Sequence, residues 1–409
     1  MVSLTACATF AFKHGVVYEA LAHGQIEQAL ASMGSESYSG RDRVVYQLDK
    51  AMMLAMLGQY AQSNTVFESA KQAMQQLSAT SITENITAVT INEATRSYAG
   101  QPYEQLLVHA YKALNYLALD DPNAARVEIL QADVKMREWA AAQELEGIKA
   151  STFVRYLAGI VYEINQEWSD ALIAYRKAYQ TLHENATGIP DFLKKDLLRL
   201  TAAQGLDDEH QKFARQFNVE DWLTLAEVRE QAQVILIHHQ GLVSRIQQHS
   251  VLHFSPELNY SVRISTPYYP TYLPYVWGAE LHVGSSRSIS SVIESIDQLA
   301  RDNLSARLPG ITLRTVARVV AKKTAAKEAG KDNSLAGLLV DFAGIVTEIA
   351  DTRSWSSLPA TIQVARVVVP SGEHRLMIPG QRPIEAIDAQ RISLRPGQIK
   401  VISIHEVVH

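Results

Sequence analysis

The stretch AMMLAMLGQYAQSNTVFESA, residues 51–70, decides the fold of the N-terminal half of the chain. Apolar residues recur three to four positions apart on both sides of Gly58, which predicts two amphipathic helices joined by a tight turn. A second loop glycine, Gly24, lies 34 residues earlier, so we expect this helical hairpin to repeat. Small residues such as Ala51 let helices cross closely, and an aromatic residue such as Phe67 fills the space between hairpins.

This spacing resembles the tetratricopeptide repeat (TPR), a family of helical hairpins. The alternative is an ordinary helical bundle with Ala and Leu at heptad spacing. Between the second and third copies, residues 78–101 are rich in Ser, Thr and Asn, and we expect a loop there. Other copies of the hairpin are each marked by a similar set of residues. The first has Gly24, Ile26, Ala29 and Met33, and the third covers Ala113–Ala132, with Pro122 starting its second helix. The fourth has Gly159, Tyr162, Trp168, Ala171, Tyr175 and Ala178, and a capping pair of helices is expected over 190–217.

The resemblance implies a binding face on the concave side of the array, formed by the first helix of each hairpin. This face is apolar throughout, which is unusual for the exposed surface of a stable monomer. Either the C-terminal half packs into the groove, or the groove holds an external acyl chain or hydrophobic peptide. The residues expected there are Leu48, Met52, Leu114, Tyr156 and Ile160.

The pattern changes after residue 217, where short apolar runs bounded by turn residues predict strands. The predicted class is α+β. A TPR-like α-solenoid over residues 8–217 precedes a β-rich, sandwich-like domain over residues 218–409, which carries a helical insertion over residues 288–350. Strands are expected at 233–241, 260–265, 279–283, 361–369, 375–378 and 398–405, a loop at 267–275, and helices at 288–306, 313–329 and 334–350.

Cys7 is the one cysteine of the chain and follows Leu4-Thr5-Ala6. This string resembles the lipobox of bacterial lipoproteins, in which the cysteine is lipidated. We therefore interpret residues 1–7 as part of a lipoprotein signal and expect the signal to begin upstream, because a full signal needs a basic segment and a longer apolar one. Ala8, where an aspartate would retain the protein at the inner membrane, implies a lipid anchor on the periplasmic side of the outer membrane.

The string Asp351-Thr-Arg353-Ser-Trp355, with His-His-Gln-Gly at 238–241, resembles an uncharacterised family of bacterial TPR outer-membrane lipoproteins. The resemblance extends over nearly the whole chain. The resemblance implies a role in cell-envelope assembly, and we expect envelope proteins as partners, including lipoproteins linked to cell-wall synthesis. Asp351, Arg353 and Trp355 could form an ion pair beside an aromatic platform, serving either as a sheet-edge anchor or as a recognition site.

Several other classes of site are disfavoured. His405-Glu-Val-Val-His409 matches a zinc-protease motif, but that motif requires a helix, and here it follows an alternating strand. The net charge of −5 gives no reason to expect nucleic acid. The basic positions between Arg314 and Lys331 form a helix face that is either solvated or attracted to anionic headgroups or glycans. No cofactor or metal site is predicted.

These observations predict a lipid-anchored adaptor without enzymatic activity, which binds envelope proteins through its repeats and its C-terminal domain. The alternatives are a carrier of an acyl chain or hydrophobic peptide in the repeat groove, and an envelope hydrolase. An unfilled apolar tunnel would favour the carrier, and a compact pocket of histidines and carboxylates would favour the hydrolase.

Overall fold

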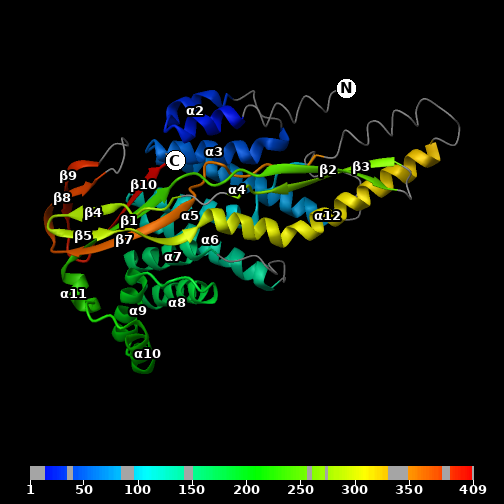
Figure 1. Cartoon of the computed structure of the whole chain (residues 1–409). Helices are drawn as coiled ribbons and strands as arrows, with labels where there is room; N and C mark the ends of the chain where they lie inside the picture. The colour runs from blue at the N-terminus through cyan, green and yellow to red at the C-terminus, as the bar shows by residue number, and fades with distance from the viewer. Residues whose placement is uncertain are drawn as a thin grey trace.

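The computed structural model describes residues 14–34, 40–83, 96–141, 151–255, 260–271, 275–329, 349–379 and 387–407. The N-terminal half is a series of helical hairpins stacked in chain order, as predicted (Figure 1). The hairpins pair a helix over residues 14–22 with α2 (Ile26–Ser32), α3 (Arg43–Met56) with α4 (Tyr60–Thr83), α5 (Pro102–Ala118) with α6 (Pro122–Ala141), α7 (Thr152–Ile164) with α8 (Trp168–Glu184), and α9 (Asp191–Ala203) with α10 (Asp207–Phe217).

The loops inside these hairpins share one backbone conformation. In each, a residue with positive φ ends the first helix, and the following N–H turns back to a carbonyl of that helix. In the second hairpin, the N–H of Gln59 donates to the carbonyl oxygen of Leu54 at 2.8 Å. This pairing satisfies carbonyl groups that a helix C-terminus otherwise leaves without partners. The positive-φ residues are Gly24, Gly58, Asp120, Gln166 and Gly205.

The C-terminal half begins with α11 (Leu225–Glu230) and contains the strands. In the described residues, the order β10-β1-β7-β6 forms the central sheet, β5-β4-β8-β9 forms the outer sheet, and β2 pairs with β3. The strands are β1 (Ala232–Gln240), β2 (Gln247–Ser255), β3 (Tyr260–Tyr268), β4 (Glu280–Val283), β5 (Ser286–Ile289), β6 (Ser291–Ser295), β7 (Thr361–Val369), β8 (Gly372–Ile378), β9 (Ile387–Leu394) and β10 (Ile399–Glu406).

β1 is buried along its whole length because both faces of the central sheet are covered. Successive side chains of a strand point to opposite faces of its sheet. Ile235 and Ile237 pack with the helices, whereas Val234 and Leu236 pack with the outer sheet. The molecule therefore has three layers, which are the helical array, the central sheet and the outer sheet. The α+β class is confirmed.

Several predicted boundaries were wrong. Residues 286–295 form β5 and β6, not the start of a helix. The β-branched residues Ile289, Val292 and Ile293 favour a strand where neighbouring strands can pair with it. One helix, α12 (Ile296–Ala329), replaces the two expected helices and continues through Pro309. It lies along β3 (Figure 1), and we infer that this packing outweighs the cost of a proline within a helix.

Other differences concern the ends of elements. α4 continues to Thr83 into the expected loop, and β3 continues to Tyr268. The sequence did not predict β2 or β9, whose polar residues mask the alternation expected of a strand. Cys7, His409 and most of the predicted helix over 334–350 lie outside the described residues. Among the described helices, none combines the length and the apolar character that a membrane span requires.

Candidate functional site

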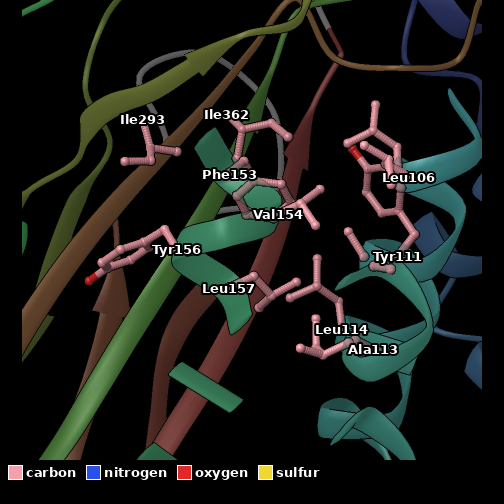
Figure 2. Close-up of a cluster of buried hydrophobic side chains, with 14 of the residues drawn as sticks. Leu106, Tyr111, Ala113, Leu114, Phe153, Val154, Tyr156, Leu157, Ile293 and Ile362 are labelled. Carbon is pink, nitrogen blue, oxygen red and sulfur yellow. The ribbon is translucent and has the colours of Figure 1, made fainter. Parts of the chain in front are cut away.

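The residues predicted on the concave face are covered by the chain's own C-terminal half. Leu48, Met52, Tyr156 and Ile160 are fully buried, and Leu114 is nearly so. They share one apolar cluster with side chains of β1, β6 and β7. Figure 2 shows the side chains of α5 and α7 facing those of the strands. In this arrangement the central sheet covers the concave face at Leu48, Met52, Tyr156 and Ile160, and Leu114 lies at the border of a groove along β10.

A buried ionic cluster holds the central sheet against the array. Arg366 of β7 contacts Glu163 of α7 at 2.7 Å and Asp196 of α9 at 2.9 Å. Arg199 contacts the same two carboxylates at 2.8 and 2.7 Å, so two cations balance two anions. Burial raises the pKa of Glu163, but the two guanidinium groups outweigh burial and lower this pKa to about 2. The hydroxyl of Tyr156 donates to Asp196 at 2.9 Å, which assigns that residue a structural contact.

The predicted group Asp351, Arg353 and Trp355 also joins the two halves. Arg353 forms ion pairs with Asp351 at 2.7 Å and with Asp42, beside the start of α3, at 3.1 Å. Trp355 is fully buried, and its backbone N–H donates to Glu104 of α5 at 2.8 Å. The structure thus brings Asp351 and Arg353 together as expected, but it places the indole in the core. The arrangement is an anchor, and the tryptophan offers no exposed platform.

Of the two histidines of the zinc-protease motif, His405 lies in β10, next to His238 and His239 of β1, whereas His409 lies outside the described residues. The rings of His239 and His405 stack with a centroid distance of 4.2 Å, and His239 Nε2 lies 2.9 Å from the Ser403 hydroxyl. Burial, together with the neighbouring His405 and His238, lowers the pKa of His239 well below its usual value. Glu406 accepts from His238 at 2.9 Å. Within the described ranges, no three His, Cys, Asp or Glu side chains are grouped so as to hold a metal ion.

A groove of about 1180 Å³ runs along β10 and is the candidate binding site. β10 is the end strand of the central sheet. One wall comes from the array and includes Leu114, Leu117 and Ile164, and the other comes from the outer sheet and includes Leu376 and Ile378. All eight residues of β10 are half-buried. The site therefore combines apolar walls from both halves with a strand at its base.

The hydrogen bonding of β10 leaves one edge of this strand facing the groove. β10 runs parallel to β1, with Gln233 opposite Ile399. The N–H of Gln233 donates to Gln398 at 2.8 Å, and the N–H of Gly241 donates to Glu406 at 2.7 Å. In a parallel pair, every second residue of a strand directs both its N–H and its C=O group toward the neighbouring strand. The even-numbered residues of β10 therefore bond to β1. The odd-numbered residues direct their N–H and C=O groups to the opposite side. No strand pairs with that edge in the part of the chain that the structure describes.

Charged groups gather near the start of β10. Arg395, which is exposed, and Lys400 line the groove on the side of the outer sheet. Among the described residues neither cation has a carboxylate partner within ion-pair distance. Asp120, in the loop between α5 and α6, is the open acid of the lining, whereas Glu406 is engaged by His238 and by Trp277 Nε1 at 3.0 Å. Of the described residues, the groove lining therefore holds two cations without a carboxylate partner, Arg395 and Lys400, and one exposed carboxylate, Asp120.

The sequence predicted the strand 398–405 but not its position at an edge, because sheet order depends on contacts between distant residues. The groove was therefore missed. The ionic cluster was missed too, although a signal existed. Arg366 is the single charge within the apolar run TIQVARVVV, residues 361–369, and a lone charge in a buried strand requires a buried partner.

No protein-family model matches the chain, and no curated protein matches it. Similar solved structures include MamA, from residue 41 to its end, of Desulfovibrio magneticus RS-1. It is 16% identical, with a TM-score of 0.31, over 51% of this chain and 92% of that one. Kinesin-light-chain TPR-like repeats of Podosopora anserina are 15% identical, with a TM-score of 0.34, over 51% of this chain and 92% of that one. Similarity this low carries no argument about function.

Proposed function

We propose that the chain is a scaffold that binds other proteins of the bacterial cell envelope in the groove along β10. The observation that carries this proposal is a strand at the base of a large groove with apolar walls, one edge of which pairs with no other strand of the described residues. A free strand edge is a template for pairing with another chain. Because the central sheet covers the concave face of the array, we place the binding site in this groove instead.

The envelope setting rests on the sequence. The string Leu4-Thr5-Ala6-Cys7 supports lipid attachment at Cys7 and a location on the periplasmic side of the outer membrane. Several acyl chains together anchor a protein stably, where a single chain binds only marginally. A carrier function would need space on the concave face, where Met52 and Tyr156 are fully buried. No observation favours the carrier or the hydrolase over the scaffold.

Cross-linking in cells tests binding at the groove. A photo-reactive amino acid replaces Leu117, in the groove wall, in the chain expressed with its complete signal. The control carries the same amino acid at Val127, which is 50% exposed on α6 and does not line the groove. We expect a defined protein adduct from position 117 and none from position 127. Equal labelling at both positions, or no adduct at position 117, would contradict the proposal.

Fractionation tests the anchor separately. In the chain expressed with its complete signal, Cys7→Ser removes the thiol that would be lipidated, so we expect the protein to leave the outer-membrane fraction and appear in the soluble periplasmic fraction. Persistence of the Cys7→Ser protein in the outer membrane would show that lipidation is not the anchor. Binding in the groove does not depend on this result.

A further inference from the structure

The edge of β10 requires a hydrogen-bonding partner of a particular kind. Ile399, Val401, Ser403 and His405 direct their backbone N–H and C=O groups into the groove, by the alternation described above. Burying such groups without partners is costly. An extended backbone laid beside β10 satisfies all of them at once, because its own N–H and C=O groups have the same spacing. At about 3.3 Å per residue, β10 offers an edge roughly 26 Å long.

The two walls determine what side chains such a backbone carries. The side chains of a strand point alternately to the two faces of its sheet. On β10 itself, Ile399 and Val401 pack with the helical array, whereas Ile402 and Ile404 pack with the outer sheet. A strand added beside β10 therefore directs alternate side chains toward the same two apolar walls. Apolar residues fit on both faces of the added strand.

The charged side chains at the start of β10 predict the charge at one end of the bound segment. Arg395 and Lys400 lie by the start of β10 without ion-pair partners among the described residues, and the lining of the whole groove adds one exposed carboxylate, that of Asp120. An acidic residue at the corresponding end of the added strand would pair with these cations. The apolar walls continue along the strand, where Glu406 is already held by His238 and Trp277.

The bound strand could belong to an isolated extended segment or to the folded sheet of a second copy of this chain. The shape of the groove favours the isolated segment. The base of the groove lies between the array and the outer sheet. The edge strand of a folded sheet brings neighbouring strands with it, and these would meet the walls. A single extended segment carries no such neighbours and fits between them.

We propose that the β10 groove binds an extended, apolar segment of a partner protein, with an acidic residue at one end, by adding it as a fifth strand to the central sheet. This inference rests on the proposed scaffold function and adds the structural class of the partner. Val401 provides its test. The N–H of Val401 points into the groove, so Val401→Pro removes a bond to the added strand and none to β1.

Selection of peptides provides a defined probe. The full chain is used to select from a display library of random linear peptides, and the selected peptides are measured by fluorescence anisotropy. We expect alternating apolar sequences with an acidic end and a loss of at least about tenfold in affinity for Val401→Pro. The matched control, Val401→Ala, keeps the N–H and should lose less. Equal loss in the two variants, or selected peptides that bind Val401→Pro normally, would overturn strand addition.

Amide hydrogen exchange of the unsubstituted chain gives a second measurement that does not depend on how Val401→Pro folds. We expect the odd-numbered amides of β10 to exchange readily in the free protein and to become protected by the selected peptide. The even-numbered amides should be protected in both states. Protection of the odd-numbered amides without peptide would mean that the chain covers its own edge. Protection that rises with protein concentration would mean that a second copy does. Either result would overturn the proposal.

The two proposals can fail separately. If the Leu117 cross-link forms and persists in Val401→Pro at wild-type yield, the scaffold function stands and strand addition is wrong. If no cross-link forms and no peptide is selected, both are wrong.

Discussion

Arg366 joins the halves of the molecule through one side chain. Its guanidinium donates to Gln233 on β1 at 2.8 Å and forms ion pairs with Glu163 and Asp196 in the array. All four groups of the ionic cluster are buried, so each depends on the others for compensation of its charge. Removing one member leaves an unpaired charge in the core, and that is far more costly than losing an exposed pair.

We therefore expect Arg366→Ala to lower the free energy of unfolding by about 3–5 kcal/mol, as for other broken buried ion pairs. The control is Arg126→Ala, which breaks the partly exposed pair with Glu167. Exposed pairs contribute roughly 0–1 kcal/mol. Urea denaturation of both variants measures the difference, and similar losses would show that the buried cluster does not hold the halves together.

His239 makes the stability of the fold dependent on pH. Because burial lowers the pKa of His239 well below its usual value, the folded protein keeps this ring neutral while the unfolded chain takes up a proton below about pH 6.5. The contribution of the neutral His239 ring to the free energy of unfolding is fully present above about pH 6.5. It is lost as the pH falls below that value, at up to about 1.4 kcal/mol per pH unit. We expect His239→Gln to reduce the slope of unfolding free energy between pH 6.5 and 5. An unchanged slope would exclude His239 as its source.

At the scale of single elements, the sequence predicted hairpins better than it predicted loops. The glycine spacing identified Gly24 and Gly58, but two equivalent loop positions carry Asp120 and Gln166 in the left-handed region, which non-glycine residues adopt only at some cost. Strands with a regular apolar pattern, such as 361–369, were predicted to the residue. Strands with polar faces, such as β2, were missed because their identity depends on a pairing partner rather than on their own pattern.

Gly159 supports the close crossing of α7 and α8. A Cβ atom at this position would overlap the ring of Tyr175, which is fully buried and donates to Glu163 at 2.6 Å. The ring cannot move without breaking that bond, so we expect Gly159→Ala to destabilise the protein by about 1–3 kcal/mol. Gly15, also in a helix, has open space at the same position. Gly15→Ala should be neutral or stabilising in thermal denaturation, and equal losses would contradict this packing argument.

At the scale of the whole molecule, the array and the central sheet share one core. The cluster that contains Leu48 and Tyr156 also contains Ile237 and Val364 from the central sheet. The sequence predicted an apolar concave face but could not tell which segment covers it, because that depends on contacts between residues far apart in the chain. The groove at β10 could not be predicted for the same reason, since its walls come from the array and from the outer sheet.

We expect residues 14–217, expressed alone, to expose the concave face. Fluorescence of a hydrophobic dye should then rise well above that of the intact chain, because the surfaces of Leu48, Met52 and Tyr156 would lose their cover. In the intact chain, Met52→Glu should lower the melting temperature strongly, since the buried carboxylate would have no partner. Stoichiometric binding of fatty acids by the intact chain, with stability retained in Met52→Glu, would mean that the face is open.

The parallel pairing of β1 with β10 also sets an order of events in time. β1 occupies residues 232–240, but its two neighbours in the sheet come from residues 361–369 and 399–406. Each hairpin of the array pairs two helices that follow each other directly, whereas the central sheet pairs strands far apart in the chain. Contacts between distant residues form slowly, because the loop between them must first be closed. We therefore expect the hairpins to form before the central sheet that covers their concave face.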